Sequence, residues 1–199
     1  MERFTTSIEG SLHTGNWFAA LFLALALPDI CAALEQPDRP VGERYKDWFQ
    51  RYLRPAYNPS STFELLEATA PETLKGMPTM VIQSMKASVP PAAAAFTAED
   101  CYRLRCKCLH QGLSERSSAD RVHFTAPDRS RRLNVHRNSF NGVLQLSIDQ
   151  FCRDVVNATL QWWSAAKGDA EVAARAQELI RVYALDATEL PIVRYGANE

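Results

Sequence analysis

The segment Thr97–Gly112, TAEDCYRLRCKCLHQG, gathers most of the side chains of this chain that could do chemistry. It holds three cysteines together with Arg103, Arg105, Lys107 and His110. Thiolates and imidazoles bind zinc, and a thiolate beside an imidazole can act as a nucleophile. An arginine and a histidine can instead bind a phosphate and transfer protons. The spacing of these residues decides which chemistry is feasible.

The pattern predicts a single helix over this segment, because Thr97 with Asp100 three residues later can cap its start and Gly112 can end it. At 100° per residue, the cysteines and His110 point in different directions and cannot converge on one tetrahedral ion. A cysteine nucleophile would have only His110 as its base, and cysteines on an apolar arc are usually inert. We therefore expect no metal and no cofactor. The cysteines concerned are Cys101, Cys106 and Cys108.

Arg105 falls within the apolar arc of this predicted helix, about 40° from Cys101. Burying an unpaired guanidinium costs several kcal/mol, so we expect Arg105 to meet an acid, a dimer partner or an anionic ligand. An acid such as Asp29 or Asp154 would make the interaction purely structural. In that case His110 is a surface residue near the helix C-terminus, where a cation is favoured.

The string from Tyr102 to Gly112 resembles the signature helix of the HEPN superfamily of helical-bundle proteins. Many members are RNases of toxin, phage-defence and RNA-processing systems, and they carry an Arg followed four to six residues later by a His. Arg105 and His110 fit this motif, with four residues between them. The specific match covers about eleven residues. In active members the residue after the Arg is usually polar, whereas here it is Cys106.

The resemblance implies metal-independent RNA cleavage, in which the ribose 2′-hydroxyl attacks the adjacent phosphate and leaves a cyclic phosphate end. His110 would be the general base or acid, and Arg105 would hold the phosphate and offset developing charge. The two side chains point about 140° apart on one helix, so a second copy facing the first would complete the site. We therefore expect a homodimer. RNA contacts are expected from Tyr102, Arg103, Lys107, Arg131 and Arg132.

The distribution of charge also bears on partners. The formal net charge is −1, so no global field recruits nucleic acid or an anionic membrane. Between Arg103 and Arg137, nine Lys or Arg face three acids, which gives this stretch +6 and the rest of the chain −7. Such a stretch indicates either a polyanionic partner or an ordinary solvated face.

Two other functions remain open beside the nuclease. One is a catalytically inactive helical module that binds a protein partner, which Cys106 favours. The other is an RNA-binding protein without catalysis, which rests on the +6 segment and predicts binding that weakens steeply with salt.

The length of 199 residues predicts one domain, 1–199, of a mainly α (α+β) class. We expect a HEPN-like helical bundle with a small antiparallel sheet inserted before the C-terminal helices. The predicted helical core covers 15–53, 97–112 and 147–185, with a variable Pro/Ala-rich connection over 54–96 in which FELLEA and MVIQSM can form short helices. The predicted sheet covers 121–147, with strands at 121–126, 133–138 and 143–148 and a turn at 139–142.

The apolar run 17–27 is too short to span a bilayer, which needs about 20 residues. We expect Pro28 to kink or restart it, and we interpret the run as a core helix. The five cysteines are an odd number, which does not suggest a disulfide framework. The chain is therefore predicted to be cytoplasmic, with no membrane partner.

Two local features complete the predictions. Ser147 with Gln150 three residues later resembles a capping box at the start of the helix after the sheet. His123 and His136 are expected on neighbouring strands, where they can meet across the hairpin or lie at its surface.

Overall fold

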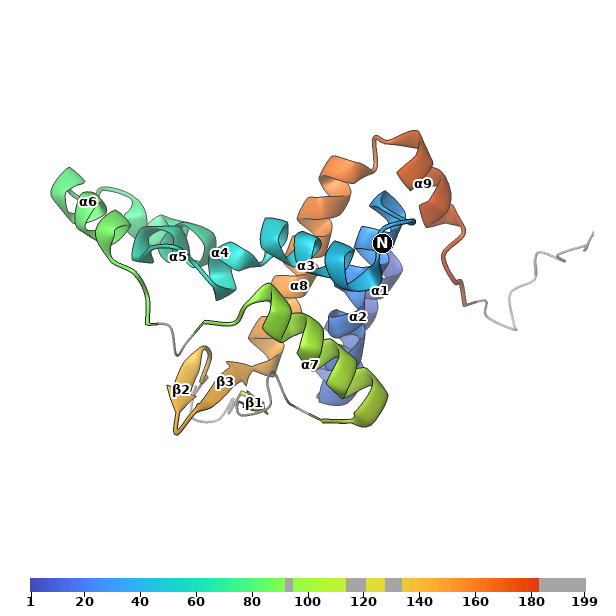
Figure 1. Ribbon diagram of the computed structural model, residues 1–199, viewed down its shortest axis with the longest axis horizontal. Coiled ribbons are helices and arrows are strands. Elements are labelled where there is room, and N and C mark those ends of the chain that lie inside the picture. The colour runs from blue at the N-terminus through green and yellow to red at the C-terminus, as the bar shows by residue number, and fades with distance from the viewer. Residues whose placement is uncertain (92–94, 114–120, 128–133, 183–199) are drawn as a thin grey trace, which may run out of the picture.

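The computed structural model describes residues 1–91, 95–113, 121–127 and 134–182. This part of the chain is mainly helical, with a small three-stranded sheet before the last two helices (Figure 1), which confirms the predicted α+β class. The helices are α1 (Glu2–Thr14), α2 (Trp17–Glu35), α3 (Val41–Tyr52), α4 (Arg54–Tyr57), α5 (Thr62–Thr69), the 3-10 helix η1 (Pro71–Leu74), α6 (Thr79–Ala87), α7 (Ala98–Gln111), α8 (Ile148–Ala166) and α9 (Ala170–Gln177). The strands are β1 (Arg121–Thr125), β2 (Asn138–Phe140) and β3 (Val143–Ser147).

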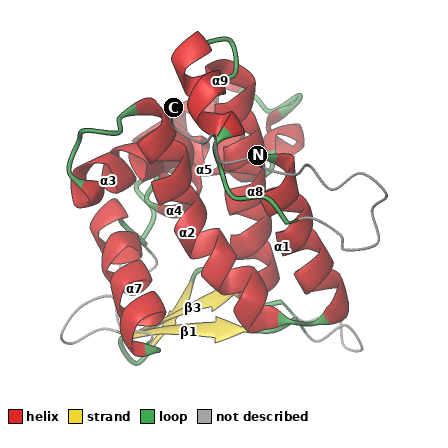
Figure 2. Ribbon diagram, turned by 90° about the vertical axis from the view of Figure 1, so that its right-hand side faces the viewer, coloured by secondary structure: helices red, strands yellow, loops and turns green. Residues whose placement is uncertain are grey.

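Helix α2 is the central element, because α1, α3, α7, α8 and α9 all pack against it. Figure 2 shows it between α7 and the pair formed by α1 and α8. Its start is capped by Asn16, whose side chain accepts a hydrogen bond from the amide of Ala19. The helix continues through Pro28 to Glu35, so the prediction that Pro28 restarts it is wrong. Packing on several sides offsets the cost of an internal proline, about 3 kcal/mol.

The length of α2 also contradicts the argument that its apolar segment is too short to span a bilayer. Its 19 residues are long and apolar enough to cross a bilayer by length and composition, which the run 17–27 alone is not. Half of its most apolar stretch is buried inside the protein, and the core helix of a soluble protein passes the same test. The cytoplasmic location and the lack of a membrane partner stay predictions.

Helix α8 packs against α2, and its buried residues include Phe151, Cys152 and Val155. The capping box predicted for Ser147 and Gln150 is wrong, because the Ser147 side chain makes no capping bond and instead donates to Asp149 over 2.5 Å.

The described part of the predicted helical region 147–185 ends earlier than expected, because α9 ends at Gln177. Val172 of α9 is buried and Leu179 packs against the core, whereas Ile180 is 74% exposed.

The sheet has the order β1-β3-β2 and is mixed rather than antiparallel. Strand β2 pairs with β3 antiparallel through the tight turn at Asn141 and Gly142, whose φ angles of 50° and 74° suit a two-residue hairpin. Strand β1 pairs with β3 in parallel, which requires a long connection and not a turn. Residues 134–137 are not part of a strand, and of the expected second strand at 133–138 only Asn138 lies in β2.

Helices α5 and α6 with η1 form a projection that we call the arm. None of its residues in these elements is buried, and Figure 1 shows it extending away from the helical bundle. At its base the Thr62 amide donates to the Ser88 carbonyl over 2.8 Å, and Arg54 forms an ion pair with Glu64. The expected short helices of 54–96 are thus confirmed.

Amide hydrogen exchange should separate the arm from the bundle. The amides of α6 should open at a free energy roughly 2 kcal/mol or more below those of the middle of α2, because α6 buries no side chain. Equal protection of the α6 and α2 amides from exchange would contradict the conclusion that the arm is the least stable part of the fold.

Candidate functional site

Helix α7 begins and ends where its sequence predicts. Thr97 Oγ1 accepts from the Asp100 amide over 3.1 Å, and Asp100 Oδ2 accepts from the Thr97 amide over 2.9 Å, which completes a capping box. Gly112 ends the helix with a left-handed φ of 68°. The capped ends fix which side chains face the bundle.

The inward face of α7 carries Cys101, Leu104 and Cys108, all buried. The Cys101 sulfur lies 3.3 Å from the hydroxyl of Tyr45, which also donates to the Leu25 carbonyl of α2 over 3.2 Å. Burial raises the pKa of Cys101 to about 12, so the thiol stays protonated near neutral pH. This cysteine is therefore a packing residue and not a nucleophile.

Arg105 is held by an acid on α2. Its Nη2 lies 2.9 Å from Asp29 Oδ2, while Arg44 of α3 donates to Asp29 Oδ1 from Nε at 3.2 Å and Nη2 at 3.0 Å. The exposed fractions of the Arg44, Asp29 and Arg105 side chains are 14%, 17% and 17%. Asp29 was one of the two acids proposed as partners for Arg105, and it is the one found. We call these three side chains the Asp29 triad; its formal charge is +1.

The triad leaves Arg105 oriented but not fully satisfied. Its Nε is buried without a hydrogen-bond partner, and Nη1 is 3.9 Å from the sulfur of half-buried Cys106. His110, five residues further along α7, is exposed. The two side chains therefore leave the helix in different directions, and Arg105 is directed to Asp29 rather than to His110.

The side chains expected to contact RNA have different surroundings. Arg103 is exposed and paired with Glu99 over 2.8 Å, while Lys107 donates to Gln111 over 3.2 Å. Tyr102 packs its ring over the backbone of Gly42, where an added Cβ would lie 3.1 Å from the ring, so it also ties α7 to α3. Arg131 and Arg132 lie outside the described residues.

The two histidines near the sheet do not meet. His123 on β1 is exposed, and β3 separates β1 from β2. His136 precedes β2 and stacks edge-on against the ring of Tyr57, with centroids 5.6 Å apart. Within the described ranges, no group of three or more His, Cys, Asp or Glu is placed to hold a metal ion.

A polar cluster that sequence reasoning missed lies between α4, the loop before β2, and α8. The buried Tyr57 hydroxyl donates to Asp154 Oδ2 over 2.7 Å, and Gln150 Nε2 donates to Asp154 Oδ1 over 2.8 Å. Asp154 was the second acid proposed for Arg105, and that pairing is wrong. Burial raises the pKa of Asp154.

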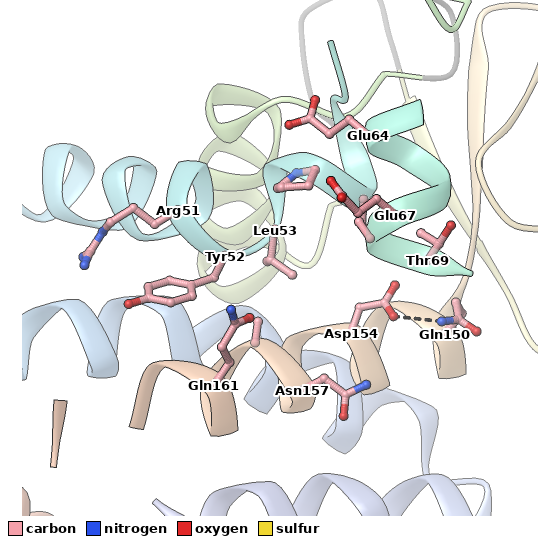
Figure 3. Close-up of a pocket in the computed structure, with 14 residues that line it drawn as sticks. Arg51, Tyr52, Leu53, Glu64, Glu67, Thr69, Gln150, Asp154, Asn157 and Gln161 are labelled. Atoms are coloured by element: carbon pink, nitrogen blue, oxygen red, sulfur yellow. Dashed lines mark hydrogen bonds between the residues drawn. The ribbon is translucent and has the colours of Figure 1, made fainter. Parts of the chain in front are cut away.

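A signal for this cluster is present in the sequence of α8. Polar residues recur at intervals of four, three and four residues, which places them on one face of a helix. Figure 3 shows the polar face lining a cavity of about 490 Å³ below α5. The face consists of Gln150, Asp154, Asn157 and Gln161.

No protein-family model, curated protein or solved structure matches this chain. The resemblance to HEPN proteins therefore rests on the α7 string alone, and membership of that superfamily stays a proposal.

Replacing Asp29 by Asn should destabilise the protein by about 3 kcal/mol, because it leaves two largely buried guanidinium groups without a counter-charge. The measurement is urea unfolding at neutral pH. Asp38→Asn is the matched control, because Asp38 is exposed, and its effect should stay within about 0.5 kcal/mol. A loss below about 1 kcal/mol for Asp29→Asn would show that the triad contributes little.

The stability should fall in mild acid because of His136. Burial, followed by the charge of Arg137, lowers the pKa of His136 from 6.5 to about 4. The unfolded chain binds more protons than the folded one between these values, so stability decreases as pH falls from about 6.5 to 4. His136→Asn should remove on the order of 2 kcal/mol of this decrease. Identical pH profiles for both proteins would refute the assignment.

Proposed function

We propose that this chain is a HEPN-like endoribonuclease that works without metal as a homodimer, with Arg105 and His110 of two facing α7 helices forming the site. The observation that carries the proposal is the Arg-x4-His pair on one well-capped helix, with Arg105 fixed by Asp29 and His110 exposed. A role in a toxin or phage-defence system is the part of this proposal that follows from the resemblance alone.

The orientation of Arg105 suits a phosphate-binding role. A guanidinium that is already held on one side by a carboxylate loses little freedom when it binds an anion on its other side. The Asp29 triad keeps a formal charge of +1, so it still attracts a phosphate oxygen. Its partial exposure, 17% for Arg105, leaves room for that approach.

A second copy is needed because one helix cannot aim both groups at the same phosphate. The outer arc of α7 offers a surface for it: His110 is exposed, and Tyr102, Cys106 and Leu109 are only half-buried. Next to the C-terminal end of α7 lies an apolar cavity of about 560 Å³ bordered by Phe18 of α2. Phe18 is 76% exposed, and exposed apolar patches commonly mark interaction surfaces.

The proposed reaction needs only proton transfer and charge stabilisation. One imidazole accepts the proton of the ribose 2′-hydroxyl while the 2′-oxygen bonds to phosphorus, and the P–O5′ bond breaks. The second imidazole starts protonated and gives its proton to the leaving 5′-oxygen, which yields a 2′,3′-cyclic phosphate and a 5′-hydroxyl. Arg105 offsets the charge that develops on the phosphate oxygens.

A catalytically inactive binding module is the second candidate, and the Asp29 triad itself favours it. The Arg105–Asp29 ion pair is a complete structural role for the arginine, and Cys106 occupies the position that is polar in active relatives of the motif. Such a module would bind a protein partner or RNA without cutting it.

Incubation of mixed RNA with the full chain in the presence of chelator tests the proposal. Cleavage should leave cyclic phosphate ends and should fall by about 10²- to 10⁴-fold in His110→Ala, with a comparable loss in Arg105→Ala. Arg153→Ala, which removes an exposed arginine of α8, is the control and should cleave normally. Sedimentation should show a dimer.

Cleavage that persists in both Arg105→Ala and His110→Ala would place the activity elsewhere. Intact RNA with the wild-type dimer would instead favour the inactive binding module. In that case, RNA retention that survives His110→Ala and weakens with salt would identify an RNA-binding role.

A further inference from the structure

A second cavity, of about 480 Å³, lies where the arm, the loop before β2 and α8 meet. Its polar wall is formed by Asn134, His136 and Arg137 of the loop and by Gln150 and Asp154 of α8. Leu66 of the arm contributes to its apolar side. The volume is within the range of small-molecule sites, about 300 to 1,000 Å³.

Arg137 borders this cavity, and no described residue is seen to pair with its side chain. Its Nε is buried and makes no hydrogen bond, and none of the described residues forms an ion pair with it. Its backbone has a left-handed φ of 55°, an uncommon conformation for a residue with a Cβ. A half-buried guanidinium without a counter-charge is costly, so an anion at this position would stabilise the fold. Burial lowers the pKa of Arg137, which is the expected sign of that cost.

Asp154, the acid among the residues that line this cavity, already accepts hydrogen bonds from its neighbours. Both carboxylate oxygens of Asp154 accept hydrogen bonds, one from Tyr57 and one from Gln150. Asp154 forms no ion pair with Arg137 in the described structure, so this carboxylate does not neutralise the guanidinium by direct contact.

His136 offers a second donor to the same cavity. Its Nδ1 accepts from the Ser147 amide over 3.3 Å, which places the proton of the neutral ring on Nε2. With its pKa lowered to about 4, the ring is neutral near pH 7, so it presents an N–H donor and no second charge. A guanidinium, a ring N–H and the Asn134 amide make a donor set suited to anionic oxygens.

The neighbouring cavity below α5 gives the rest of a ligand a place to bind. The two cavities share Ala56, Thr69, Gln150 and Asp154, so they adjoin along α8. Figure 3 shows Asn157 and Gln161 continuing the polar face beyond Asp154. Side-chain amides both donate and accept, which suits an uncharged polar group.

We propose that this pair of cavities binds a small organic anion, a phosphate ester or a carboxylate, with its anionic group against Arg137 and His136 and its uncharged polar part along α8. The site is separate from α7 and does not depend on the proposed ribonuclease activity. Binding would also tie the arm to the bundle, because the arm contributes Leu66 and Thr69 to the cavity walls.

The test is thermal unfolding and calorimetric titration of the full chain with inorganic phosphate, adenosine 5′-monophosphate, succinate and uncharged adenosine. At least one anion should raise the Tm of the wild type, and adenosine alone should raise it less. Comparison of adenosine 5′-monophosphate with succinate distinguishes a phosphate ester from a carboxylate as the anionic group. Arg137→Gln should bind the effective anion at least about tenfold more weakly, whereas Arg153→Gln, an exposed residue of α8, should bind it normally.

The ligand-free protein provides an independent readout. Arg137→Gln should raise the Tm without any added anion, because it removes an unpaired, half-buried charge. Arg137→Lys, which keeps the charge and loses the planar fork, should retain part of the binding. The proposal is overturned if no anion stabilises the wild type, or if Arg137→Gln responds to the anions as the wild type does.

Discussion

The carboxylate of Asp29 binds two guanidinium groups, and the positions of three helices depend on it. It lies on α2, the helix around which the bundle packs, and it joins that helix to α3 through Arg44 and to α7 through Arg105. Apolar packing alone would allow these helices to shift or rotate relative to one another, because hydrophobic contacts are not directional. An ion pair at this depth adds little net stability, yet it strongly disfavours arrangements that leave any of its charges unpaired.

Much of α7 could be predicted from sequence because its signals are local. The cap residues, the terminal glycine and the position of Arg105 on the inward arc all follow from spacing along one helix. The choice of Asp29 over Asp154 could not be predicted, because it depends on how α2, α7 and α8 are placed in three dimensions. The same limit applies to the sheet: the β3 strand and its turn are local features, whereas the parallel pairing of β1 with β3 is a long-range one.

Arg105 and Arg137 follow the same physical rule with different outcomes. Arg105 and Arg137 are both withdrawn from water and both carry a charge that needs compensation. Asp29 compensates Arg105, so α7 is fully supported by the bundle whether or not RNA binds. Arg137 has no such acid in the described parts of the chain, and its loop and the arm frame a cavity instead. The arm buries little of its own surface, so a ligand there would act on the weakest part of the fold.

The most direct test of the central role of Asp29 is a double-mutant cycle on unfolding free energy, with Asp29→Asn, Arg105→Gln and the double variant. Both groups are largely buried and in direct contact, so the coupling energy should be about 1 to 3 kcal/mol. The double variant should then be more stable than the sum of the single losses indicates, because loss of the carboxylate no longer leaves a charged guanidinium on α7 unpaired. Additive losses, with a coupling energy below about 0.5 kcal/mol, would contradict the claim that this ion pair positions α7 on α2.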